Sequence, residues 1–132
     1  MGHTYVDVEL TSPVTGESVS VNALVDTGAT TSTIPKDLAD KLNLPEITRR
    51  RVVTASGQED MPVSYAIIDV SGEKTVTDLL ISTKLNRVLI GVTTLESLAF
   101  KVNPETGKLE KTEVLLLFSA EIATPLARND KM

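Results

Sequence analysis

Strict alternation of apolar and polar residues near the start of the chain limits the possible folds more than any other feature. The segments Thr4–Thr11 and Ser18–Val25 each place apolar side chains at every second position, which is the period of a strand with one buried face. Ser12–Gly16 lies between them and contains a Pro and a Gly suited to a turn, so we predict a β-hairpin. Val, Ile and Thr supply 39 of the 132 residues, and because β-branched side chains favour strands, we predict a mainly β fold.

The same signals predict further strands along the rest of the chain. A turn is predicted at Ser56–Gln58, where small and polar residues interrupt the apolar pattern, and Gly57 within it is expected to have a positive φ. The predicted strands are Arg49–Ala55, Met61–Val70, Thr75–Ser82, Arg87–Ile90 and Val114–Phe118, with a short hairpin between Lys101–Val102 and Lys108–Leu109.

Two short helices are also predicted. The first opens at Ile34-Pro35, since proline fits a first helical turn, and it ends at Pro45, because proline stops a helix. The second covers Thr93–Phe100.

Length and charge limit the organisation and the partners of the chain. We expect one domain over residues 1–118 and a loose C-terminal tail over residues 119–132. The net charge of −5 argues against a nucleic-acid partner, since binders of phosphate backbones are usually basic. We see no leader pattern at the start and no apolar run long enough to span a bilayer, so we expect a cytoplasmic protein with no membrane partner.

The residue types that are scarce limit the possible chemistry. The chain has no cysteine, which excludes disulfides, thiolate metal sites and cysteine nucleophiles. Its single histidine, His3, lies beside the N-terminus, which argues against serine–histidine catalysis and histidine-ligated metals. We therefore expect no metal and no cofactor, and in an enzyme of this composition carboxylates would carry most proton transfer.

One carboxylate stands out, in the segment Ala23–Thr30. An apolar strand runs directly into Asp26, and a small, turn-forming stretch follows. A carboxylate at that position would be partly desolvated, and Gly28 would let another backbone approach closely. A simpler interpretation is that Asp26 only begins an Asx turn after the strand.

The segment Val25–Thr30 resembles two families. It is similar to the phosphate loop of the actin and hexokinase ATPases, but those enzymes need two large lobes, and here the segment leads into a helix rather than a strand. The other resemblance is to the retropepsin-like aspartic proteases, whose small single-domain archaeal and bacterial members it matches over Val6–Phe118. The matching segments are Asp26–Ala29, Ile34–Ala39, Val53–Gln58, Val88–Gly91, Thr94–Leu98 and Val102–Leu109.

This resemblance implies a closed β-barrel of the acid protease fold and an aspartic endopeptidase that acts on polypeptides. Asp26 would be the catalytic residue, and Thr27 and Gly28 would support its loop, Thr27 by bonding across a dimer axis. The residues implied to bind substrate are Gly28, Ala29 and Thr30 in that loop, and Ala55, Ser56 and Gly57 at the tip of a mobile flap. Thr30 departs from the family, in which Asp or Ser is common there.

Only one Asp-Thr-Gly occurs in the chain, whereas the family's chemistry needs two facing aspartates. The resemblance therefore implies a homodimer in which each chain supplies one Asp26. The alternative is a non-catalytic retropepsin-like module for dimerisation or peptide binding. Two further segments stay open: Arg49–Arg51 is either a solvated strand or a weak partner patch, and Leu115–Phe118 is either core or dimer interface.

Overall fold

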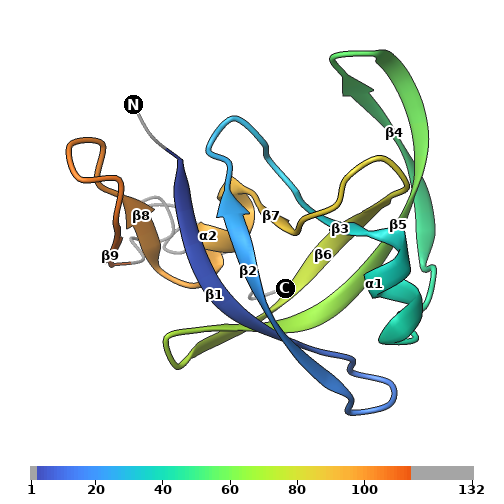
Figure 1. The fold of residues 1–132 in the computed structure, drawn as a ribbon, viewed down its shortest axis with the longest axis horizontal. Coiled ribbons are helices and arrows are strands. Elements are labelled where there is room, and N and C mark those ends of the chain that lie inside the picture. Colours follow the sequence, from blue (N-terminus) through green and yellow to red (C-terminus); the bar gives the residue numbers. More distant parts are fainter. Residues whose placement is uncertain (1–2, 114–132) are drawn as a thin grey trace, which may run out of the picture.

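Strands make up just over half of residues 3–113, the part of the chain that the computed structural model describes (Figure 1). The mainly β class predicted from the alternation is confirmed. The strands are β1 (Thr4–Thr11), β2 (Ser18–Val25), β3 (Ser32–Pro35), β4 (Thr48–Thr54), β5 (Gly57–Val70), β6 (Glu73–Ser82), β7 (Leu89–Ile90), β8 (Phe100–Val102) and β9 (Leu109–Lys111), and the helices are α1 (Lys36–Lys41) and α2 (Val92–Ser97).

The main sheet closes on itself as a barrel. Its strands follow the order β1-β2-β7-β3-β6-β5-β4, and an additional pairing of β1 with β5 joins the two sides. Among the described residues, strand β4 pairs only with β5, so these two strands form a hairpin that extends beyond the barrel (Figure 1). The closed barrel agrees with the fold class expected from the sequence, and it leaves the β4–β5 hairpin as a projecting arm.

The first hairpin follows the predicted alternation. Strands β1 and β2 pair in antiparallel register from Thr4 opposite Val25 to Thr11 opposite Ser18. Val8 and Leu10 point inward and are buried, while Tyr5, Asp7 and Glu9 on the opposite face are exposed. The period-2 pattern therefore predicted both the strands and the face that enters the core.

The core fills the barrel and extends under both helices. Its fully or almost fully buried side chains come from strands, helices and the connections between them: Leu10, Ala23, Ile34, Ala39, Leu42, Ala66, Ile68, Leu79, Val88, Ile90, Leu95 and Leu98. A separate small cluster of Met61, Val63 and Leu80, with Val52 packed against it, lies where the β4–β5 hairpin leaves the barrel. This second cluster supplies apolar surface beside the candidate site described below.

Strand β3 was missed by the sequence analysis. Ser32–Pro35 is buried at every position and pairs in parallel with β6 and in antiparallel with β7. A four-residue strand that is buried on both faces shows no alternation, and its hydroxyl-bearing residues look like a loop in the sequence. The missed strand carries the chain from the Asp26 segment to α1.

Both helices are shorter than predicted. Pro35 does precede α1, but the helix ends at Lys41, because Asn43 adopts a left-handed conformation (φ 53°) that terminates it before Pro45 is reached. In the same way, Ala99 (φ 60°) follows the end of α2, and Phe100 begins strand β8 instead of completing the helix.

The turn between β4 and β5 lies one residue earlier than predicted. Thr54 pairs with Gly57, so the turn consists of Ala55 and Ser56, and β5 starts at Gly57 rather than at Met61. The Thr54 side chain closes the turn by donating to the Gly57 carbonyl (3.1 Å) and accepting from the Ser56 N–H (3.2 Å).

The predicted strand Val114–Phe118 and the tail lie outside the described residues. Within residues 3–113, neither helix has the length and apolar character needed to cross a membrane.

Candidate active site

Asp26 lies at the end of β2, where pairing with β7 fixes the backbone. Strand β2 runs parallel to β7, and the Asp26 N–H donates to the Ile90 carbonyl at 2.9 Å. The half-buried carboxylate accepts a bond from the Gly28 N–H through Oδ1 (2.9 Å), and the Ala29 N–H donates to the Asp26 carbonyl (3.1 Å). The Asx turn considered from the sequence is therefore present. It engages Oδ1, and within residues 3–113 no hydrogen bond or ion pair engages Oδ2.

The start of α2 holds the loop that follows Asp26. The Val92 N–H donates to the Ala29 carbonyl (2.9 Å). The Thr30 carbonyl accepts from both the N–H of Thr93 (3.1 Å) and its hydroxyl (2.6 Å). The Asp26 loop, defined here as residues 26–31, is thereby anchored to residues 90–93 by backbone geometry.

Gly91 makes this close approach possible. A Cβ atom at that position would lie 2.7 Å from the Thr31 carbonyl carbon and 2.9 Å from the Ala29 oxygen. Its φ of −92° is open to any residue, so the need for glycine is one of space. The apolar-apolar-Gly pattern at Val88–Gly91 was seen in the sequence, and the structure gives it a physical reason.

A buried chain of hydroxyl groups braces the same junction from beneath. Gly91 N–H donates to Ser32 Oγ (2.9 Å), Ser32 lies 2.6 Å from Thr94 Oγ1, and Thr94 lies 2.7 Å from Thr77 Oγ1. Thr77 donates onward to the Asp78 carbonyl (3.2 Å), which gives the chain one consistent direction from Gly91 to Asp78. Sequence reasoning missed these residues, because a buried threonine and an exposed one look alike in a sequence rich in threonine.

A cavity of about 420 Å³ brings Asp26 together with the tip of the β4–β5 hairpin. Two of the residues predicted at that tip, Ala55 and Ser56, line this cavity. Its other walls are largely apolar and come from the hairpin and from β3, β6, β7 and the loop before β7: Thr33, Val52, Thr54, Glu59, Met61, Leu80, Ser82, Lys84, Leu85 and Leu89. Among the described residues, the only ion pair across these walls joins Lys84 to Glu59 (3.0 Å).

A second cavity, also about 420 Å³, adjoins the first and shares Thr33, Val52 and Leu80 with it. Three predicted substrate-binding residues of the Asp26 loop line it, namely Gly28, Ala29 and Thr30, and Thr31, Arg50, Arg51 and Val53 complete the lining. Together the two cavities form a cleft between the Asp26 loop and the β4–β5 hairpin.

Two predicted site residues line neither cavity. Thr27 is exposed in the Asp26 loop. Gly57 is exposed just beyond the tip of the hairpin, and it has the positive φ expected from the sequence (122°).

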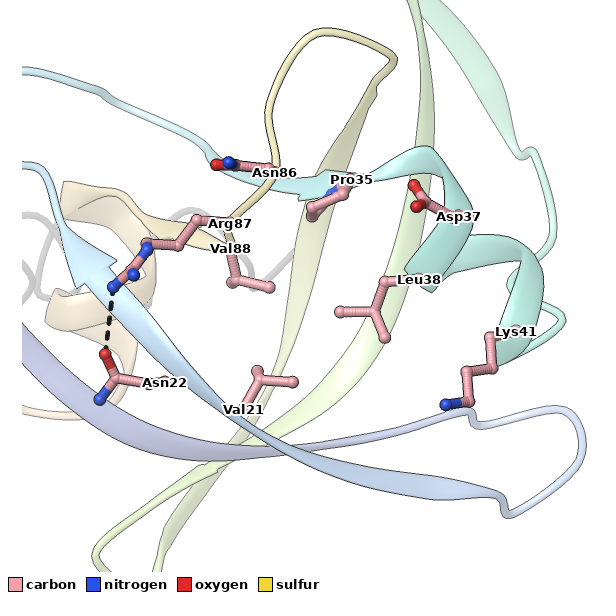
Figure 2. A pocket seen from close by; sticks show the side chains of 9 residues that line it. All are labelled: Val21, Asn22, Pro35, Asp37, Leu38, Lys41, Asn86, Arg87 and Val88. Carbon is pink, nitrogen blue, oxygen red and sulfur yellow. Dashed lines mark hydrogen bonds between the residues drawn. The ribbon is translucent and has the colours of Figure 1, made fainter.

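A third cavity, about 380 Å³ in volume, lies on another part of the barrel between β2, α1 and the segment before β7. Figure 2 shows Val21, Leu38 and Val88 pointing into it, with Arg87 held by a hydrogen bond to Asn22 (3.1 Å) at its edge. It includes no residue of the Asp26 loop or the β4–β5 hairpin, so it is separate from the cleft. Within residues 3–113 no group of three or more His, Asp or Glu side chains is placed to hold a metal ion.

Comparisons with known proteins found a matching family and a similar fold. Residues 12–97 match the family model described as "gag-polyprotein putative aspartyl protease". The fold is similar to the solution structure of the Simian Foamy Virus (mac) protease, with a TM-score of 0.53 and 21% identity over 70% of this chain and 91% of that one. No match was found among curated proteins.

Proposed function

The chain belongs to the family of gag-polyprotein aspartyl proteases, and on this premise we propose that it is a homodimeric endopeptidase that hydrolyses peptide bonds between two Asp26 carboxylates. The observation that carries the proposal is the position of Asp26 in the cleft, beneath the β4–β5 hairpin and on a loop held at both ends. An extended peptide could lie in such a cleft and pair with backbone groups on both sides.

The homodimer follows from the number of aspartates. A pepsin-type reaction needs two aspartates. The most similar other segment, Asp69–Gly72, covers the end of β5 and the turn before β6, where Asp69 Oδ1 accepts from the Gly72 N–H (2.9 Å). The second carboxylate must then come from another copy of the chain. Thr27 and Gly28 are exposed on the protomer and are available for a two-fold contact, in which the Thr27 hydroxyl would bond across the axis.

In the proposed reaction the two carboxylates share one proton, since two close negative charges are costly. The ionised Asp26 takes a proton from a water molecule, and the water oxygen bonds to the peptide carbonyl carbon. The partner's Asp26 gives its proton to the carbonyl oxygen, which forms a neutral tetrahedral intermediate. When the intermediate collapses, the C–N bond breaks and the carbonyl double bond forms again. The leaving nitrogen takes the proton that Asp26 had accepted from water, and one hydroxyl of the intermediate returns its proton to the partner's Asp26.

The β4–β5 hairpin would serve as the flap over the bound peptide. Its tip residues Ala55 and Ser56 line the same cavity as Asp26, and the hairpin leaves the barrel with no other strand on its β4 side within residues 3–113. Movement of such an arm would admit the peptide and then separate it, with the reacting water molecule, from bulk solvent.

The proposal is tested by cleavage of an unfolded protein at acidic pH, with and without pepstatin. Cleavage that pepstatin abolishes is the expected result. Binding of an unfolded protein without any cleavage, over the whole acidic range, would contradict it and favour a non-catalytic peptide-binding module.

The hairpin's role gives a separate prediction for Gly57→Val. A β-branched residue resists the φ of 122°, so the Ala55-Ser56 turn should shift, and turnover should fall by about tenfold or more. Gly72→Val is the matched control, because Gly72 also has a positive φ (88°) and open space around its Cα but lies in the β5–β6 turn. Peptide turnover and thermal melting of both variants should show similar losses of stability, with a loss of turnover confined to Gly57→Val. Equal turnover in the two variants would exclude the hairpin as the flap.

A further inference from the structure

The two cavities of the cleft differ in charge. The cavity that contains Asp26 carries Glu59 and Lys84, which neutralise each other at 3.0 Å. The adjoining cavity has two charged lining residues, Arg50 and Arg51, and its described lining contains no carboxylate. One half of the cleft is therefore electropositive, although the chain as a whole has a net charge of −5.

Arg50 lies on the face of β4 that covers the cleft. Successive residues of a strand point to opposite faces, so Arg50 shares a face with Val52 and Thr54, which line the cavity with Asp26. The pairing of Arg50 with Met61 across the hairpin agrees, because Met61 lines that cavity too. By the same alternation Arg49 and Arg51 fall on the other face, although Arg51 also borders the adjoining cavity.

The neighbouring arginines are already bonded within the hairpin and the segment that leads into it. Arg49 pairs with Glu46 (3.4 Å) and Asp60 (3.5 Å), and Arg51 Nη1 donates to Gln58 Oε1 (3.3 Å). Among residues 3–113, Arg50 makes no ion pair and no side-chain hydrogen bond.

Glu59 is the carboxylate on the same face of the hairpin as Arg50, since it lies opposite Val52. Its oxygen Oε2 already accepts from Lys84 (3.0 Å) and lies 3.4 Å from the Thr54 hydroxyl oxygen. The guanidinium of Arg50 is thus available to a group from outside the chain.

We propose that Arg50 determines specificity by binding an acidic side chain of the peptide substrate in the cavity it shares with Gly28, Ala29 and Thr30. The inference rests on the proposed protease function. A guanidinium presents paired N–H donors that match a carboxylate, and the threonines across the cavity are neutral and do not compete for it. A two-fold dimer contains this cavity twice, so an acidic residue is preferred at one position on each side of the cleaved bond.

The test uses peptides that are identical except for Glu, Gln or Lys placed in turn at each position around the cleaved bond. For wild type, kcat/KM should be about fivefold or more higher with Glu than with Gln at one position on each side, and the difference should shrink as salt is added. Arg50→Gln should remove the difference, and Arg50→Glu should favour Lys at the same positions. Arg49→Gln is the matched control, because it makes the same change of charge on the opposite face of β4.

The outcomes separate the two proposals. Equal cleavage of the Glu, Gln and Lys peptides by wild type, or an equal effect of Arg49→Gln and Arg50→Gln, would overturn the role of Arg50 while leaving the protease function intact. A wild-type protein that cleaves none of the peptides would overturn the protease function and the specificity with it.

Discussion

Replacing Asp26 with Asn is expected to reduce peptide cleavage by about 10³-fold or more and to leave the fold of the protomer intact. The side-chain amide keeps an oxygen that can accept the Gly28 N–H bond, now 2.9 Å long, so the Asp26 loop should hold its shape. It cannot take a proton from water, so general-base catalysis is lost. Stability should hold or rise, because one carboxylate is removed from each side of a crowded pair.

The matched control is Asp69→Asn. Asp69 Oδ1 also accepts a backbone N–H at 2.9 Å, from Gly72, in a turn away from the cleft. The two variants change the same charge in similar local structures, so kcat/KM and thermal melting can be compared directly. Substantial cleavage by Asp26→Asn, beyond what contaminating wild-type protein explains, would contradict the assignment of Asp26.

Gly91→Ala is expected to have the largest effect on stability. The added methyl group would lie within 3 Å of backbone atoms of Ala29, Thr30 and Thr31, and backbone cannot move aside as a flexible side chain can. This steric overlap can be removed only if the Asp26 loop and the start of α2 move apart. That movement should lower the free energy of unfolding by about 3 kcal/mol. Because a displacement of about 1 Å at a catalytic group can cost about 10²-fold in rate, turnover per folded molecule should fall as well.

Gly16→Ala provides the control for Gly91→Ala. Gly16 has a positive φ (80°) and nothing near its added methyl group, so it reports the cost of an unfavourable backbone conformation alone, about 1 kcal/mol. Denaturant unfolding and turnover should be measured on both variants. A stability loss in Gly91→Ala no greater than that in Gly16→Ala would show that the contact between Gly91 and the Asp26 loop is not tight.

Local patterns in the sequence predicted those parts of the fold that depend on neighbouring residues. The β1–β2 hairpin was predicted because alternation and a Pro-Gly turn both act within Thr4–Val25. The positive φ of Gly57 was predicted for a similar reason, since glycine in a tight turn is a local signal. The helix ends were wrong, because Asn43 and Ala99 adopt left-handed conformations that helix-forming patterns do not reveal.

The features of the fold that the sequence did not reveal depend on pairing between residues far apart in the chain. Strand β3 exists because β6 and β7 pair with it on either side, and its own residues carry no alternation. For the same reason the hydroxyl chain through Ser32 and Thr94 could not be predicted, since these residues are 62 positions apart. More of the cleft could be predicted from the sequence, since Asp26, Ala55 and Ser56 do line one cavity. The electropositive cavity with Arg50 could not be predicted, because the sequence does not show which face of β4 covers the cleft.

The requirement for two chains is the central claim, and mixing wild-type and Asp26→Asn chains tests it most directly. The two proteins are unfolded and refolded together at constant total concentration, so that subunits pair at random, and cleavage is measured across the mixing range. If each site needs one Asp26 from each chain, activity follows the square of the wild-type fraction and falls to about one quarter in an equal mixture. A linear dependence, with about one half of the activity in an equal mixture, would mean that a single chain holds a complete site and would contradict the account.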